Sequence, residues 1–183
     1  EWIEKQTNIQ TNYPRMLSGR VQGRFLTMLT ELCGARQVLE IGCFTGYSAL
    51  CFAYGVGEAG HVDTLEINDE LEELTRSGWR RSGIEDRITL HIGEALDTLK
   101  TLSEQGRRYD LVYIDANKRE YLEYYEAVLP LVRQGGLILA DDTMLGGKVC
   151  QDQVPADKQT RGLVRFNEAV ASDSRVECVM LPI

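Results

Sequence analysis

The stretch QVLEIGCFTGYSAL, residues 37–50, predicts a buried strand, a glycine-rich turn and a helix in immediate succession. The run Gln37–Gly42 has the composition of a buried strand, and Tyr47–Tyr54 continues as a helix. Gly42 and Gly46 allow the backbone to turn tightly and to approach a ligand closely. Because the first N–H groups of such a helix have no partner within it, this turn is a candidate binding loop.

The alternation of short apolar runs with helical patterns continues along the chain. Further strands are predicted at His61–Ile67, Arg87–Gly93, Tyr109–Asp115, Gly135–Asp142 and Val176–Ile183. Further helices are predicted at Asp69–Gly83, Glu94–Gln105, Arg119–Val132 and Thr160–Ala171. Asn68 or Asp69 is placed to cap the first of these helices, and Gly83 to end it. The pattern predicts a doubly wound, mostly parallel α/β sheet with helices on both faces.

Carboxylates stand at the ends of most of the predicted strands. In an open parallel sheet, ligands bind beyond the carboxyl ends of the strands, near the point where the strand order reverses. The carboxylates at or next to these ends are Glu40, Glu66, Glu94, Asp115, Asp141 and Asp142. One acidic residue at a strand end is commonly a helix cap, but several at one sheet edge favour a ligand site.

The glycine loop favours a nucleoside with a cationic group over a dinucleotide. Position 44 is Phe, so the middle glycine of the G-x-G-x-x-G fingerprint is absent. Glu40 would repel a pyrophosphate but suits a cation such as the amino group of S-adenosylmethionine (SAM). Glu66 ends the second strand, where an acidic residue can bind both ribose hydroxyls. A structural turn is the alternative for the loop taken alone, and a nucleotide-dependent dehydrogenase fits it less well.

Asp115, Asp141 and Asp142 form a candidate metal site. Asp115 ends the fourth predicted strand and the other two end the fifth. Neighbouring strands would bring these three charges together, and they would repel one another unless a cation lay among them. Hard oxygen ligands favour Mg²⁺, Mn²⁺ or Ca²⁺ over Zn²⁺. Helix capping with an unrelated ion pair to Lys118 stays open as the alternative.

Composition narrows the class of protein. The chain has 183 residues and a formal net charge of -8, which suits one domain and weakly disfavours non-specific binding to nucleic acid or anionic membrane. We expect neither a membrane span nor a signal peptide. Five cysteines without a C-x-x-C pair argue against a disulfide framework or structural zinc and favour a reducing compartment. A cytoplasmic location is therefore expected.

Seven blocks of the sequence together resemble the cation-dependent class I O-methyltransferases, the caffeoyl-CoA and catechol O-methyltransferase group, which includes the bacterial O-methyltransferase family 3. The blocks are SGRVQGRFL (18–26), VLEIGCFTGYSAL (38–50), LEIN (65–68), GEALDTL (93–99), YIDANKREYLEYY (113–125), GGLILADDTMLGGKV (135–149) and FN (166–167). They cover nearly the whole chain, and the E-I-G-x-x-x-G-Y-S and I-D-A-x-K motifs are the specific ones. The resemblance implies the Rossmann-like fold of class I SAM methyltransferases, with N-terminal helices.

The resemblance also implies roles, position by position. The residues around the methionine part of the cofactor would be Leu17, Glu40, Gly42, Cys43 and Ser48. Glu66 would hold the ribose, and Ala95 would lie by the adenine. The metal ligands would be Asp115, Asp141 and Asp142. Asp115 would also adjoin the cofactor and act in catalysis with Lys118, which would lie beside the reacting hydroxyl as a base or as a cation.

The implied activity is SAM-dependent and divalent-cation-dependent methyl transfer (EC 2.1.1.-) to a hydroxyl of a small catechol-like or vicinal-diol acceptor, by a homodimer. The alternative acceptor is the 5-hydroxyuridine at the tRNA wobble position, for which a rim of basic residues could serve. Scattered surface charge is the plainer explanation of those residues. A binding module derived from an enzyme is a third hypothesis, which intact Asp115, Lys118 and Asp141 disfavour.

We expect one methyltransferase domain over residues 1–183, with a helical cover at 1–33 and a Rossmann-like core at 34–183. The sequence departs from the family in several places, and three of them bear on the site or the sheet. Asp142 stands where relatives usually have Asn, which adds a negative charge to the metal site. Leu145 replaces a common Trp, so an aromatic wall is lost. The chain stops at Ile183, where relatives continue, so a final strand is expected to be missing.

Overall fold

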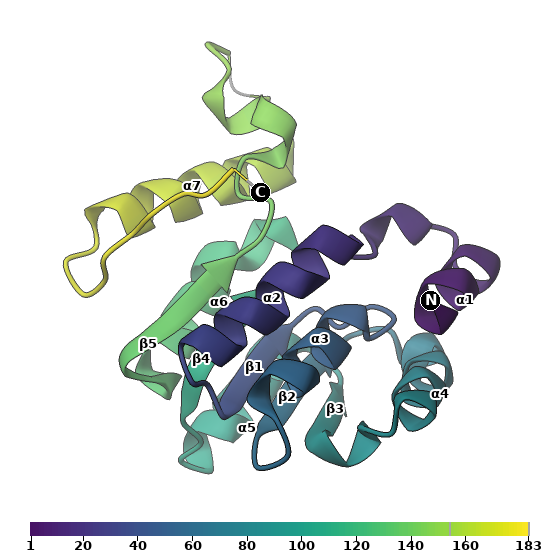
Figure 1. Ribbon diagram of the computed structural model, residues 1–183. Helices are drawn as coiled ribbons and strands as arrows, with labels where there is room; N and C mark the ends of the chain where they lie inside the picture. The colour runs from purple at the N-terminus through teal and green to yellow at the C-terminus, as the bar shows by residue number, and fades with distance from the viewer. Residues whose placement is uncertain (154, 183) are drawn as a thin grey trace.

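The computed structural model describes residues 1–153 and 155–182 and contains one five-stranded sheet (Figure 1). The strands are β1 Gln37–Ile41, β2 His61–Glu66, β3 Ile88–Ile92, β4 Tyr109–Ile114 and β5 Val132–Ala140. Their order is β3-β2-β1-β4-β5, and every neighbouring pair is parallel. This confirms the predicted doubly wound α/β fold. The strand order reverses between β1 and β4, so a ligand site is expected at the carboxyl ends of these two strands.

Helices cover both faces of the sheet, as Figure 1 shows. The α-helices are α1 Trp2–Gln10, α2 Arg20–Leu32, α3 Tyr47–Val56, α4 Glu72–Ser82, α5 Ala95–Glu104, α6 Tyr121–Val128 and α7 Lys158–Ser172. Short 3-10 turns lie at η1 Pro14–Met16, η2 Asp69–Leu71, η3 Glu85–Arg87, η4 Lys118–Glu120, η5 Leu129–Leu131 and η6 Leu145–Cys150. The helices predicted after β1, β2, β3 and β4 and the one at Thr160–Ala171 all form, with ends shifted by a few residues.

Two apolar layers hold the helices to the sheet. Phe52 of α3 and Trp79 of α4 are fully buried on one face. Tyr121 of α6, Leu131 of η5 and Leu163 of α7 are fully buried on the other. Fully burying a large apolar side chain is worth about 1.5–3 kcal/mol. Since both faces are covered, the strands are apolar along most of their length, which explains why their continuous apolar runs were visible in the sequence.

The α4 segment follows the predicted start and stop signals. The Asn68 side chain accepts a hydrogen bond from the Glu70 backbone N–H at 3.1 Å, so Asn68 is the cap. Gly83 ends α4 in the left-handed conformation with φ of 68°. A 3-10 turn replaces the first three residues of the predicted helix.

The strand predicted at Val176–Ile183 is wrong for the residues that the structure describes. Residues 176–182 form no regular element, and Ile183 lies outside the described range. Val179 is 77 % exposed and Met180 is 56 % exposed. Their side chains favour a strand, but a strand also needs a hydrogen-bonding neighbour, and β5 pairs only with β4 in the described part of the chain.

Two expectations about the class of protein can be checked directly. All five cysteines are free thiols, as the sequence predicted. Within residues 1–153 and 155–182, no helix has the length and apolarity needed to cross a bilayer.

Candidate active site at the carboxyl ends of β1, β2, β4 and β5

The carboxyl ends of β1, β4 and β5 are aligned by one continuous ladder of backbone hydrogen bonds. Ile41 pairs with Ile114, and Ile114 pairs with Ala140. The next residues extend the ladder, because the Asp115 N–H donates to the Ile41 carbonyl and the Asp141 N–H to the Ile114 carbonyl, both at 2.9 Å. The first residue after each strand therefore lies at one edge of the sheet, which brings the predicted cofactor loop next to the predicted acceptor side.

Position 42 requires a glycine, because the backbone after β1 lies very close to the backbone after β4. The φ of Gly42 is +102°, and a Cβ built on it would lie 2.1 Å from the Asp115 carbonyl oxygen. Gly46 opens α3 with φ of +81°, and a Cβ there would lie 2.7 Å from Trp79. The Trp79 indole N–H donates to the Gly46 carbonyl at 2.9 Å, which fixes the end of the loop. Both glycines therefore allow the tight turn that the sequence predicted, and their approach to a ligand stays a prediction.

Glu40 is a buried carboxylate with one oxygen unused. It is 0 % exposed, its Oε2 accepts a hydrogen bond from Thr64 at 2.5 Å, and its Oε1 has no partner among the described residues. Burial raises the pKa of Glu40 to about 8, against the opposing effect of the Ser48 and Thr64 hydroxyls. An unpartnered buried carboxylate oxygen beside a glycine loop suits a cationic group, so this position fits the ammonium of SAM.

Glu66 shapes the loop from β2. Its Oε2 accepts from the Phe44 N–H at 2.7 Å and its Oε1 from the Asn68 N–H at 2.9 Å. Glu66 is half-buried, and each carboxylate oxygen retains a further lone pair. It can therefore hold the loop and still accept hydrogen bonds from two ribose hydroxyls.

Two of the remaining predicted cofactor residues, Cys43 and Ser48, belong to this loop and to the first turn of α3. Cys43 is buried, and its backbone N–H donates to the Leu65 carbonyl at 3.0 Å. Ser48 is buried in the first turn of α3, and Ala95 is half-buried at the start of α5. Leu17 lies apart from them, where η1 meets the start of α3. It lines a crevice of about 170 Å³ together with Glu4, Asn8, Pro14, Ser18, Gly19, Arg20 and Tyr47.

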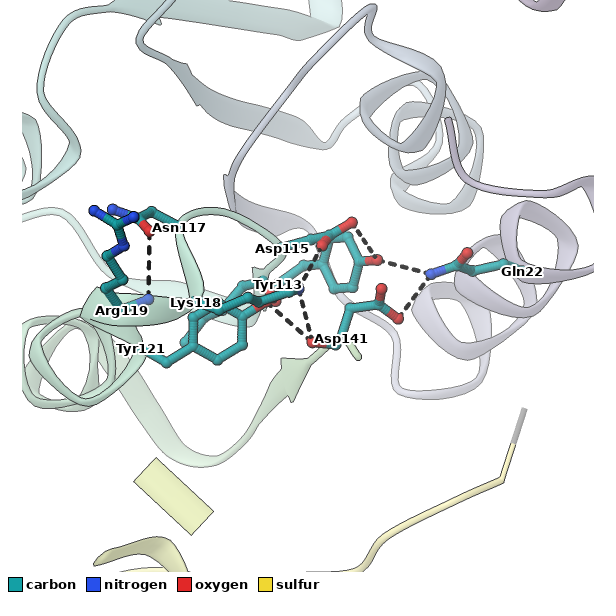
Figure 2. Close-up of polar contacts among 9 residues, drawn as sticks. Gln22, Tyr113, Asp115, Asn117, Lys118, Arg119, Tyr121 and Asp141 are labelled. Atoms are coloured by element: carbon teal, nitrogen blue, oxygen red, sulfur yellow. Dashed lines mark hydrogen bonds and ion pairs between the residues drawn. The ribbon is translucent and has the colours of Figure 1, made fainter. Parts of the chain in front are cut away.

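Lys118 lies between Asp115 and Asp141 (Figure 2). Its Nζ donates to Asp115 Oδ1 at 3.0 Å, to the Asp141 carbonyl oxygen at 3.1 Å and to the Tyr121 hydroxyl at 2.5 Å. Its side chain is 12 % exposed, so this ammonium is largely withdrawn from water. The ion pair between Lys118 and Asp115 therefore belongs to the site and is not an unrelated surface pair.

The predicted aspartate cluster is only partly assembled. Asp115 and Asp141 converge on Lys118, whereas Asp142 is exposed, with a positive φ of 50°. Burial raises the pKa of Asp141 to about 6, with a further contribution from the charge of Asp115. In the part of the chain that the structure describes, no three Asp, Glu, His or Cys residues are arranged as a metal site. The donors have the chemistry that a hard cation needs, but Lys118 provides the positive charge in this arrangement.

Sequence reasoning missed Gln22 and Tyr113. The Gln22 Nε2 of α2 donates to the Tyr113 hydroxyl and to Asp141 Oδ1, both at 2.9 Å. Tyr113 precedes Asp115 by two residues, so strand alternation could have placed both on one face of β4. No sequence signal indicates the Gln22 contact, because it depends on how α2 lies over the sheet.

Several known proteins resemble this chain in sequence and in architecture. The family model described as O-methyltransferase matches residues 2–183. The chain belongs to the O-methyltransferase family. Caffeoyl-CoA O-methyltransferase 2 of Populus trichocarpa is 37 % identical over 179 residues, a match that covers 92 % of this chain and 71 % of the relative. Caffeoyl-CoA O-methyltransferase 2 of Zea mays is 38 % identical over 179 residues, and this match covers 92 % of this chain and 67 % of the relative.

Solved structures agree with this assignment. An O-methyltransferase from Bacillus cereus in complex with SAH has a TM-score of 0.88 and 34 % identity, and the match covers 94 % of this chain and 80 % of that one. The O-methyltransferase TomG from Streptomyces achromogenes, in complex with SAM, has a TM-score of 0.89 and 34 % identity. This match covers 95 % of this chain and 79 % of that one. The protein is thus a SAM-dependent O-methyltransferase with a Rossmann-like fold, as the sequence predicted.

Proposed function

We propose that this O-methyltransferase methylates a hydroxyl of a small catechol-like or vicinal-diol acceptor and depends on a divalent cation. The observation that carries the proposal is the adjacency of Gly42 to Asp115, whose side chain contacts Lys118. A donor on the β1 loop and an acceptor beside Lys118 would then share one sheet edge. Holding nucleophile and methyl group in one geometry is a large part of such catalysis.

The proposed cofactor contacts follow from the loop. Glu40 binds the ammonium of SAM through its unpartnered oxygen, together with Leu17, Gly42, Cys43 and Ser48 around the methionine part. Glu66 accepts from the ribose hydroxyls, and Ala95 lies by the adenine. The burial of Glu40 supports this assignment, because its Oε1 has no partner among the described residues and a bound ammonium would supply one.

Lys118 is proposed to act as a cation. Its Nζ donates to three oxygens, and a neutral amine has only two hydrogens to donate. The ammonium would stabilise the oxyanion that develops on the acceptor. Proton acceptance by neutral Lys118, the other role considered from the sequence, requires one of these hydrogen bonds to be lost.

The cation is proposed to bind through Asp115, Asp141 and Asp142. Burial and, after it, the charge of Asp115 raise the pKa of Asp141, so a positive charge bound at this edge would favour the ionised carboxylate. A divalent cation there would lower the pKa of the acceptor hydroxyl and orient it. Mg²⁺ suits such oxygen donors, and Mn²⁺ and Ca²⁺ are the other candidates.

The acceptor class is tested by incubating the protein with SAM, Mg²⁺ and a panel of catechols, with matched single phenols as controls. The proposal expects a mass increase of one methyl group in the catechols alone. Methylation of the single phenols at the same rate would contradict the requirement for adjacent oxygens.

A second candidate acceptor carries phosphate, as in a coenzyme A ester or in tRNA with 5-hydroxyuridine. The observation in its favour is an open groove of about 330 Å³ lined by Arg119, Lys158, Arg161, Gly162 and Arg165. A Cβ on Gly162 would lie 2.4 Å from the Lys118 carbonyl oxygen, so the groove adjoins the turn that carries Lys118. Arg165 pairs with Glu123 at 3.1 Å, and within the described residues the other basic side chains form no ion pair.

Charge substitutions separate the two acceptor classes. With a phosphate-bearing acceptor, Arg161→Gln should raise KM about tenfold and leave turnover of a free catechol unchanged. Lys100→Gln is the matched control, because Lys100 is an exposed basic residue on α5. An unchanged KM in Arg161→Gln would remove the support that the groove gives to this candidate.

We further propose a cytoplasmic homodimer made of one domain per chain, on the resemblance to the family. Light scattering on the purified protein tests the assembly, and a monomer at micromolar concentration would contradict it.

A further inference from the structure

A chain of hydrogen bonds links α2 of the N-terminal cover to both strand-end carboxylates (Figure 2). Gln22 Nε2 donates to Asp141 Oδ1 and to the Tyr113 hydroxyl, and that hydroxyl donates to Asp115 Oδ2 at 3.4 Å. We propose that Gln22 and Tyr113 are positioning residues, which hold Asp115 and Asp141 in the orientation that methyl transfer requires.

The direction of this chain is set by the carboxylates. An ionised Asp141 accepts only, so the NH₂ side of the Gln22 amide must face it. The amide has two hydrogens, one for Asp141 and one for the Tyr113 oxygen. The Tyr113 hydroxyl, having accepted from Gln22, directs its own hydrogen to Asp115. The hydrogen bonds of the chain therefore all run toward the two carboxylates, from Gln22 directly to Asp141 and through the Tyr113 hydroxyl to Asp115.

Both positioning residues are held by packing that does not depend on the site. Tyr113 is 2 % exposed, and its ring lies against Phe52 at a centroid distance of 5.4 Å. Gln22 precedes Gly23, where a Cβ would lie 2.8 Å from Cys51 Sγ of α3. Since α2 approaches α3 this closely, the position of Gln22 is fixed by the fold before any ligand binds.

The chain gives each carboxylate a hydrogen-bond donor other than Lys118. On Asp115, Oδ1 accepts from Lys118 and Oδ2 from Tyr113. On Asp141, Oδ1 accepts from Gln22, while the carbonyl oxygen accepts from Lys118. Without these donors the carboxylates could rotate, but Glu40 and Glu66 would keep their contacts. The loss should therefore appear in kcat and not in cofactor affinity.

The kinetic test compares Tyr113→Phe, Gln22→Ala and the double variant on a catechol acceptor. Tyr125→Phe is the matched control, because Tyr125 is also buried and donates to a carboxylate, Asp173 at 2.8 Å. Each single variant is expected to lower kcat about tenfold with unchanged affinity for the demethylated cofactor, measured by calorimetry. Because both residues act through one chain of hydrogen bonds, kcat of the double variant should be little lower than kcat of the worse single variant.

Three results would overturn the proposal: full kcat in Tyr113→Phe, a double-variant loss equal to the product of the single losses, or an equal loss in the Tyr125→Phe control. This kinetic arm rests on the proposed catechol acceptor. If the native protein turns over no catechol, the proposed function fails and the positioning role is judged by a second measurement.

That second measurement is nitrogen-15 NMR of the Gln22 side-chain amide, assigned by its absence in Gln22→Ala. The native amide protons are expected to exchange slowly with water, and Tyr113→Phe should shift them and speed their exchange. Unchanged signals and exchange in Tyr113→Phe would show that the two side chains are not linked.

Discussion

Gln22 and Asp141 are 119 residues apart in the sequence, yet the Gln22 amide donates to the Asp141 carboxylate at 2.9 Å. This contact joins the first long helix after the N-terminus to the last strand of the sheet. It places the N-terminal cover at the proposed acceptor side of the site, while Glu40 and the glycine loop form the proposed cofactor side. The predictions below separate these two sides.

On the cofactor side, Glu40→Gln removes the carboxylate that can pair with the ligand ammonium, with little change of shape. The variant should bind SAM and its demethylated product about tenfold or more weakly, because the ligand ammonium loses its partner. Binding of methylthioadenosine, which lacks the amino acid part, should be unchanged. Calorimetry with both ligands decides the matter, and an equal loss for both would show that Glu40 acts on the loop and not on the ammonium.

Gly42→Ala tests the close approach of β1 to β4. The new Cβ would meet the Asp115 carbonyl oxygen at 2.1 Å and the residue would keep a positive φ. We expect a loss of about 3 kcal/mol or more in unfolding free energy.

Gly83→Ala is the control for this strain. Gly83 has φ of +68° and open space around it, so it carries the backbone cost of about 1–2 kcal/mol without the collision. Urea unfolding of both variants measures the difference. Equal losses of unfolding free energy in the two variants would mean that the ends of β1 and β4 can move apart freely.

Much of this architecture could be predicted from the sequence because local signals agree with the fold. The apolar runs located β1 to β4 within a residue or two, and the strand-end carboxylates marked the ligand edge. For β5 the prediction began at Gly135, whereas the strand begins at Val132, before two glycines that weaken the pattern. The contact of Gln22 and the exposure of Asp142 could not be predicted, because both depend on packing between distant elements.

Lys118→Met tests the cationic role on the acceptor side. Methionine fills similar space without charge, so the stabilisation of the oxyanion would be lost while cofactor binding is kept. We expect kcat to fall about 100-fold or more, with Lys118→Arg intermediate. Stopped assays with radiolabelled SAM provide the measurement. An activity of Lys118→Met that recovers fully at high pH would indicate that Lys118 acts as the proton acceptor instead.

Asp142→Asn tests the extra carboxylate of the acceptor side. Asn tolerates the positive φ of this position, so the variant changes charge with little backbone strain. One less negative charge should weaken Mn²⁺ binding several-fold. Titration calorimetry measures the affinity, and unchanged or tighter binding would contradict a contribution of the Asp142 charge to metal affinity.

Asp63 lies away from the candidate active site, and its lowered pKa predicts how the free energy of unfolding depends on pH. Burial opposes its ionisation, but hydrogen bonds from His91, Arg107 and Tyr109 outweigh burial and lower the pKa of Asp63 to about 2. A lowered folded-state pKa stabilises the protein above the unfolded-state value near 4, and this stabilisation disappears as pH falls from about 4 to about 2. The contribution at pH 7 is about 2 kcal/mol.

Denaturant unfolding at pH 7 and at pH 3 checks this prediction against Asp63→Asn. The native protein should lose more stability than the variant between the two values, because the variant lacks the titrating group. Equal losses would assign the acid sensitivity to other carboxylates.

The most direct test of the central claim is methyl transfer from labelled SAM to a catechol before and after treatment with EDTA. The account predicts that chelation abolishes transfer, that added Mg²⁺ restores it, and that Asp115→Asn does not respond to Mg²⁺. Full transfer in the presence of EDTA would contradict a cation held by Asp115 and the aspartates after β5.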